Sequence, residues 1–335
     1  MYRFIIIQCS TFLICWAILL GCVFHRAKEM SALNFIRTPE GIRDLNYPSW
    51  LLRESRHLSL VSKRVIFLGD SVVNGWKATA EEYTISSQFA KQLAHPDMQT
   101  FTFALMGLGA RDYQQICQEN LRDGDYVVVQ LLPLGERLEQ GIILSPKAYG
   151  PPAEWRAPFL LLRGQVASSY GKAPSFLLFD GVRHAKEMIK QKSFHPILPK
   201  NYKPFSPENP TVNNVLDLRN LEQFGMPFSD KAKDGVEKLL DLLSRHRERT
   251  LIYITPLNPY YLDQRGLQIN ANFRSNIEWI KTLLQKNGFR YLDYVLDKRV
   301  LEMDDFIDYS HYTDEAAIKM GNILATDFTQ SVLRP

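Results

Sequence analysis

The sequence predicts an α/β protein built on one doubly wound parallel sheet with helices on both faces. Strand-length apolar runs alternate with helical patterns in the order β-α-β-α-β, an insertion, then α-β-α-β-α. The run Val65–Leu68 leads directly into Gly69-Asp70-Ser71, which is typical of a sharp turn at the carboxyl end of a buried strand. The chain has 335 residues, of which 45% are hydrophobic and 23% charged, an ordinary globular composition.

Each element follows from a local pattern: continuous or alternating apolar runs predict strands, and an apolar face at helical spacing predicts helices. The predicted strands are Val65–Leu68, Thr100–Leu105, Asp125–Leu131, Thr250–Thr255 and Arg290–Tyr294. The predicted helices are Thr79–Leu93, Asp112–Leu121, Asp230–His246, Asn272–Asn287 and Asp314–Val332, with a polar turn over Asp308–Asp314. Ligands bind at the carboxyl edge of such a sheet, where Ser71 is expected.

The N-terminus carries a candidate membrane anchor. Residues Phe4 to Phe24 are predominantly apolar and uncharged, close to the ~20 residues that a helix needs to cross a bilayer core. We interpret them as a retained single-span anchor, with a cleaved signal peptide as one alternative and a lipoprotein signal, from Leu19-Leu20-Gly21-Cys22, as another. Arg3 precedes the span, and Arg26 and Lys28 follow it, so the positive-inside rule only slightly favours a cytoplasmic domain.

The predicted organisation is an anchor over residues 1–25, a tether over 26–61 with a short helix around Trp50–His57, and a main domain over 62–335. An insertion at about 136–229 interrupts this domain and carries 11 of the 18 prolines. We expect a helix within it, at Phe179–Lys192. A long irregular segment at the carboxyl edge is more often a lid or binding surface than a passive loop, which is the alternative.

Composition and spacing exclude several classes of protein. A net charge of +4 suits an anionic membrane or polymer and does not favour nucleic acid. There is no zinc-type Cys/His spacing, P-loop or dinucleotide fingerprint, so neither a metal nor an organic cofactor is expected. Only Cys117 lies beyond the first 22 residues, so the main domain holds no internal disulfide. Val72-Val73 after Ser71 departs from the α/β-hydrolase elbow.

A serine nucleophile needs a base, normally a histidine oriented by a carboxylate. Of the seven histidines, only His311 lies in a short turn before the last predicted helix with an acid at suitable spacing, Asp308. On a turn, that spacing allows Asp308 to contact one ring nitrogen while the other faces Ser71. Ser71, His311 and Asp308 are therefore the candidate catalytic residues.

These motifs resemble a known family. Phe67-Leu68-Gly69-Asp70-Ser71 and Asp308-x-x-His311 resemble the first and last signature blocks of the SGNH/GDSL hydrolase superfamily. The resemblance implies a flavodoxin-like three-layer α/β/α sandwich. It also implies that Ser71 is the nucleophile, that His311 acts as general base and then general acid, and that Asp308 orients His311.

The second block of the family matches at Gly109 in Met-Gly-Leu-Gly-Ala, whose backbone N–H would form an oxyanion hole with that of Ser71. The third block, Gly-x-Asn-Asp, does not match, because Val129–Glu136 contains no Asn. Gln130 lies too deep in its strand to be a convincing substitute, whereas Asn258 follows the next strand at the correct edge. The candidate substrate-binding residues are Asp70, Asn74 and Asn258.

The anchor and insertion resemble membrane-anchored, cell-envelope branches of this superfamily, which act in teichoic-acid D-alanylation and alginate O-acetylation. This implies an extracytoplasmic serine esterase or O-acyltransferase on acylated envelope carbohydrate. One alternative is a catalytically weak scaffold that binds envelope-assembly membrane proteins, and another is a lipase or thioesterase acting on membrane lipid. A Ser71–His311 separation near ~3 Å favours an enzyme, and a much longer one favours the scaffold.

Overall fold

The computed structural model of the protein describes residues 35–37, 63–139 and 222–334, with gaps at 76–77, 79–80, 94–96, 105–106, 265, 268–269, 296 and 298–299, together with residues 10, 11 and 14. The chain divides into two compact units. The first comprises Met1–Leu33, Ile42–Leu60 and Ser145–Pro196, and nearly all of it lies outside the described residues. The second comprises Asn34–Gly41, Val61–Leu144 and Ile197–Pro335, and it contains every element discussed below.

The second unit is built on one parallel sheet. Its strands are β1 (Phe35–Arg37), β2 (Lys63–Gly69), β3 (Met98–Ala104), β4 (Tyr126–Leu131), β5 (Thr250–Ile254) and β6 (Arg290–Asp293). The strand order is β1-β3-β2-β4-β5-β6, and every pair is parallel. Without the short β1, this is the strand order of flavodoxin-like sheets. After β3 is added on one side of β2, the later strands are added on the other side, and ligands bind at this switch point, beyond the carboxyl ends of β2 and β4.

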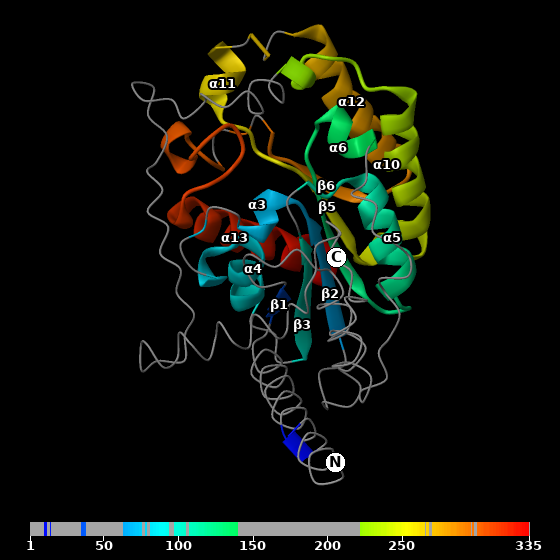
Figure 1. The fold of residues 1–335 in the computed structure, drawn as a ribbon. Coiled ribbons are helices and arrows are strands. Elements are labelled where there is room, and N and C mark those ends of the chain that lie inside the picture. Colours follow the sequence, from blue (N-terminus) through cyan, green and yellow to red (C-terminus); the bar gives the residue numbers. More distant parts are fainter. Residues whose placement is uncertain are drawn as a thin grey trace, which may run out of the picture. The chain divides into compact units, whose positions relative to one another are not determined.

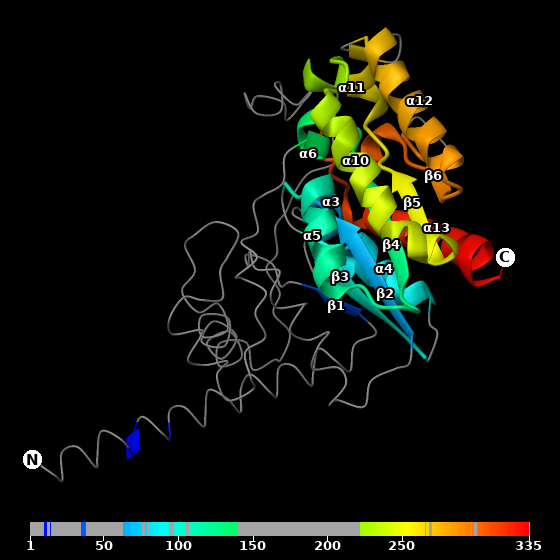
Figure 2. The ribbon, with the colours of Figure 1, turned by 90° about the vertical axis from the view of Figure 1, so that its right-hand side faces the viewer.

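Helices cover both faces of this sheet, as the sequence predicted. The helices are α3 (Ser71–Asn74), α4 (Ile85–Leu93), α5 (Ala110–Asn120), α6 (Gly135–Glu139), α10 (Asp230–Leu243), α11 (Pro259–Gln264), α12 (Ala271–Lys286) and α13 (Asp314–Phe328). The 3₁₀ helices are η1 (Glu81–Tyr83), η4 (Ser244–Arg249) and η5 (Met303–Asp305), and η6 (Thr329–Leu333) is a π-helix. Helices α4 and α13 pack on one face, and α5, α10 and α12 cover the other (Figures 1 and 2).

The first predicted strand lies at the centre of the core. Residues Val65–Leu68 are fully buried. Phe67 meets Phe89 of α4 edge-on with ring centroids 5.4 Å apart, and Phe89 meets Phe328 of α13 at the same distance. Helix α13 also approaches α4 closely, since a Cβ on Gly321 would lie 2.6 Å from Cβ of Gln88. This packing fixes the last helix, and therefore the turn before it, relative to β2, whose carboxyl end leads into Ser71.

Several element boundaries differ from those predicted. The predicted helix Thr79–Leu93 is divided into η1 and α4, because the Thr84 hydroxyl accepts a hydrogen bond from the backbone N–H of Ser87 and begins a new helix. The predicted terminal helix is α-helical only as far as Phe328, and the residues after it form η6. The segment predicted as a tether contributes a strand, β1, and the start of the predicted insertion forms α6.

Other predictions lie largely or wholly outside the described residues. The expected helices at Trp50–His57 and Phe179–Lys192 are wholly outside. Of the predicted anchor, only Ser10, Thr11 and Ile14 are described, and they are helical. Across the part of the chain that the structure describes, no helix has the length and apolar character needed to span a membrane.

Candidate active site

The turn that presents Ser71 is shaped by its neighbours in sequence. A Cβ on Gly69 would lie 2.3 Å from Cβ of Val73, so only glycine allows the strand to bend so sharply into α3. The Asp70 carboxylate caps α3 by accepting a hydrogen bond of 2.9 Å from the backbone N–H of Val72. Gly75, with a φ of 66°, ends the helix after one turn. Ser71 therefore stands as the first residue of α3, directly beyond the carboxyl end of β2.

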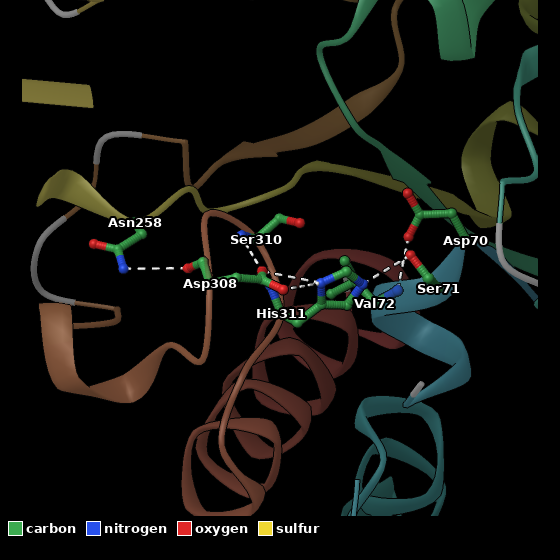
Figure 3. A network of polar contacts seen from close by, with 7 residues as sticks. All are labelled: Asp70, Ser71, Val72, Asn258, Asp308, Ser310 and His311. Atoms are coloured by element: carbon green, nitrogen blue, oxygen red, sulfur yellow. Dashed lines mark hydrogen bonds and ion pairs between the residues drawn. The ribbon is translucent and has the colours of Figure 1, made fainter. Parts of the chain in front are cut away.

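Ser71, His311 and Asp308 form a continuous hydrogen-bonded chain (Figure 3). The Oγ of Ser71 lies 2.9 Å from Nε2 of His311. The Nδ1 of His311 lies 3.0 Å and 2.9 Å from the two carboxylate oxygens of Asp308. When Nδ1 carries the ring proton and donates a hydrogen bond to the ionised Asp308, Nε2 is left unprotonated to accept the Ser71 hydroxyl proton.

The turn that carries the imidazole is held by backbone bonds. The Oδ1 atom of Asp308 accepts hydrogen bonds from the backbone N–H groups of Ser310, at 3.0 Å, and His311, at 2.8 Å. The carbonyl oxygen of His311 accepts a bond of 2.8 Å from the backbone N–H of Ile307. Asp308 is 2% exposed, so little water competes for its carboxylate. The same carboxylate thus shapes the turn and orients the ring.

Asn258, in the loop between β5 and α11, supports this turn. Its Nδ2 donates to the carbonyl oxygen of Asp308 at 3.2 Å, and its Oδ1 accepts from the backbone N–H of Tyr260 at 3.0 Å. Its backbone N–H donates to the carbonyl oxygen of Tyr309 at 2.9 Å. Asn258 is fully buried. Its side chain lies in the interior and positions the His311 turn, and its role in substrate binding stays a prediction.

A second interior network holds the Ser71 turn from the neighbouring strands. Oε1 of Gln130, on β4, accepts a hydrogen bond of 2.8 Å from the backbone N–H of Asp70. Its Nε2 donates at 3.0 Å to the hydroxyl of Thr255, which donates at 3.1 Å to the carbonyl oxygen of Leu131. Gln130 and Thr255 are both fully buried. Gln130 is thus too deep to contact a substrate, as expected, and it fixes the turn instead.

The carboxyl group of Asp70 is electrostatically unusual. Burial raises its pKa, while the hydrogen bond from the N–H of Val72 and the positive charge of Arg137 oppose that rise. Burial, with the charge of Asp70 as a further contribution, also raises the pKa of Tyr113 and of Tyr312. Asp70 is 3% exposed and lies beneath the site, and its role in substrate binding stays a prediction.

The predicted oxyanion donors differ in their availability. The backbone N–H of Ser71 has no hydrogen-bond acceptor among the described residues. The N–H of Gly109 donates to Oδ2 of Asp112 at 3.0 Å, which caps α5. The predicted role of Gly109 as an oxyanion donor is therefore blocked in this arrangement by a carboxylate. A Gly-x-x-Asp pattern at a helix start is a capping-box spacing, the sequence signal that could have indicated this.

Two further polar residues lie at this edge. Nδ2 of Asn74 donates to the carbonyl oxygen of Ala104, at the end of β3, at 2.8 Å, and its role in substrate binding stays a prediction. Arg137, on α6, donates from Nη1 to the carbonyl oxygen of Gly107 at 3.1 Å, and sequence analysis did not identify it.

Among the described residues, no group of three or more His, Cys, Asp or Glu side chains is arranged to hold a metal ion.

No protein-family model matches the chain, and no curated protein sequence matches it significantly. Solved structures provide distant matches. The carbohydrate acetylesterase Est24 from Sinorhizobium meliloti is 12% identical with a TM-score of 0.37, over 80% of this chain and 99% of that one. A lipolytic G-D-S-L family member from Veillonella parvula is 8% identical with a TM-score of 0.38, over 82% and 100%.

An extracellular lipase from Streptomyces rimosus is 12% identical with a TM-score of 0.38, over 80% of this chain and 100% of that one. At such identities and TM-scores, these likenesses carry no conclusion about activity. The functional proposal rests on the geometry of the site.

Proposed function

We propose that this chain is a serine esterase or O-acyltransferase in which Ser71 is the nucleophile, His311 the general base and Asp308 the orienting carboxylate. One observation carries the proposal: the 2.9 Å contact between Ser71 Oγ and His311 Nε2, with Asp308 on the opposite ring nitrogen. Such a chain activates a hydroxyl that is otherwise a poor nucleophile near neutral pH. Ser71 lies just beyond the carboxyl end of β2, and His311 and Asp308 lie in the turn before α13; packing in the core holds the two segments together.

The acylation step follows from this arrangement. As Ser71 Oγ bonds to the ester carbonyl carbon, its proton moves to His311 Nε2, and the carbonyl π electron pair moves to the oxygen. The resulting imidazolium is stabilised by Asp308, which remains ionised. When the oxyanion collapses, the bond to the leaving alkoxide breaks, and Nε2 returns its proton to that oxygen.

The acyl-enzyme is resolved by the same groups acting on a second hydroxyl. His311 takes a proton from water or from a sugar hydroxyl, whose oxygen attacks the acyl carbon. Collapse of this second intermediate breaks the bond to Ser71 Oγ, which regains a proton from His311. Water as acceptor makes the chain an esterase, and a sugar hydroxyl makes it an acyltransferase.

For the substrate, we propose an acylated carbohydrate of the cell envelope, with the chain anchored by Phe4–Phe24 and its catalytic domain outside the cytoplasm. The uncharged N-terminal run, the modest positive charge of +4 and the resemblance of the anchor and insertion to those of envelope acylation proteins support this proposal. The specific observation that favours the scaffold alternative is the engagement of the Gly109 N–H by Asp112 together with the absence of the third-block Asn.

A substrate panel tests the proposed function. The full chain, in lipid nanodiscs, is incubated with p-nitrophenyl acetate, an acetylated oligosaccharide and phosphatidylcholine vesicles. We expect acetate release from the acetylated oligosaccharide, loss of that activity in Ser71→Ala, and wild-type rates in Ser244→Ala, an exposed serine in η4. Fatty-acid release from vesicles alone would replace the carbohydrate substrate by a lipid, and a folded chain without any turnover would contradict the enzyme proposal.

A further inference from the structure

Arg137 connects the two loops that flank the strand carrying Ser71. In the sheet, β2 lies between β3 and β4. Gly107 follows β3, whereas Arg137 belongs to α6, which follows β4 and lies beyond the carboxyl end of the sheet (Figure 1). Nη1 of Arg137 donates to the carbonyl oxygen of Gly107 at 3.1 Å. The side chain therefore reaches from one flanking loop to the other, across the end of β2.

The charge of the same guanidinium also acts on the Ser71 turn. The positive charge of Arg137 is among the groups that oppose the burial-driven rise in the pKa of Asp70, the residue before Ser71. It likewise opposes the rise in the pKa of Tyr113, whose main cause is also burial. Arg137 is half-buried, so its charge is only partly screened by solvent.

The guanidinium retains donors for a ligand. It carries five N–H groups in a fixed planar fork. Among the described residues, its one hydrogen-bond acceptor is the carbonyl oxygen of Gly107. The remaining N–H groups of Arg137 have no acceptor among the described residues. They can therefore donate to an oxygen that becomes negatively charged beyond the end of β2.

The oxyanion site, beyond the end of β2, lacks two of the hydrogen-bond donors that the family pattern implies. The Gly109 N–H is engaged by the Asp112 carboxylate, and the loop after β4 contains no Asn. That carboxylate also disfavours a second negative charge nearby. Of the groups the sequence predicted for this role, only the Ser71 N–H has no acceptor in the described residues.

We propose that Arg137 binds the oxyanion formed on the substrate carbonyl when Ser71 attacks, together with the Ser71 N–H. Arg137 thereby supplies the hydrogen bond that the Gly109 N–H was predicted to donate and that the family's third-block Asn, absent here, would donate. The inference rests on the proposed serine chemistry and names one more group that touches the reacting atoms. A hydrogen bond that forms to the oxyanion but not to the carbonyl oxygen of the bound ester lowers the barrier to acylation without strengthening substrate binding.

Steady-state hydrolysis of p-nitrophenyl acetate by the full chain tests this inference. We expect Arg137→Gln to lower kcat by about 10²–10³-fold, the usual effect of removing one oxyanion donor, with KM changed less than about threefold. Arg137→Lys, which keeps the charge but not the planar fork, is expected to retain an intermediate rate. Arg245→Gln, an exposed arginine in η4, serves as the matched control and is expected to keep wild-type kinetics.

Chemical rescue separates a direct role from a structural one. Arg137→Ala leaves space for a small cation, so added guanidinium at millimolar concentration is expected to restore part of kcat. A loss of activity that guanidinium does not restore, accompanied by a lowered unfolding temperature, would show that Arg137 only stabilises the two loops and would overturn the proposal. An active wild type with kcat unchanged in Arg137→Gln would overturn it while leaving the serine mechanism intact. A folded wild type without turnover would overturn both.

Discussion

Replacing His311 by alanine is expected to lower kcat for ester hydrolysis by about 10⁴–10⁶-fold. The variant removes the group 2.9 Å from Ser71 Oγ that accepts its proton during attack. KM is expected to change little, because the imidazole acts on the transition state rather than on the bound ester. Steady-state kinetics with p-nitrophenyl acetate measure both quantities.

His246→Ala is the matched control for this prediction. His246 is also buried, at 7% exposure, but it lies in η4, before the amino end of β5 and thus at the opposite edge of the sheet from Ser71. Its removal is expected to affect stability and to leave kcat within a few-fold of wild type. Equal losses of kcat in the two variants, or a near-normal kcat in His311→Ala, would contradict the assignment of His311 as the base.

Asp308→Asn is expected to lower kcat by about 10⁴-fold, the second large effect. The amide can still accept the backbone bonds of Ser310 and His311, so the turn is kept. However, an amide nitrogen facing Nδ1 favours the wrong imidazole tautomer and carries no charge to stabilise the imidazolium. Kinetics and a thermal unfolding curve are measured on the same preparation, so that a loss of activity is separated from a loss of fold.

Asp305→Asn provides the comparison for this variant. Asp305 belongs to the same segment and likewise accepts a backbone N–H, from Glu302 at 2.8 Å. Its carboxylate pairs with Lys319 rather than with a histidine. We expect it to keep nearly wild-type kcat. Full activity in Asp308→Asn would contradict the assignment of Asp308 as the orienting carboxylate. An equal loss in Asp305→Asn would show that the effect belongs to the segment and not to the imidazole.

Local signals in the sequence predicted the core of the fold. The strand containing Val65–Leu68 and the turn into Ser71 are defined by neighbouring residues, so their position could be predicted without tertiary information. The short β1 could not, because three residues in a mixed segment become a strand only by pairing with β3. The start of α4 depends on a single hydroxyl, that of Thr84, within a segment of uniformly helical composition.

The site shows the same distinction. Ser71, His311 and Asp308 could be brought together in advance, since each stands at the end of a predictable element. The partnership of Gln130 with Thr255 could not, because it joins residues 125 positions apart. Arg137 was missed for a related reason. Its reach to Gly107 depends on β2 lying between β3 and β4, which becomes clear only when the order of the strands is known.

The identity of the nucleophile is tested most directly by fluorophosphonate labelling of the full chain followed by peptide mass analysis. A serine activated by His311 attacks the phosphorus, a P–O bond forms and fluoride leaves. The proposed mechanism predicts one phosphonyl adduct, on the peptide that contains Ser71, absent in Ser71→Ala and retained in Ser244→Ala. A folded wild-type chain that acquires no adduct, or that carries it on a residue other than Ser71, would contradict the account.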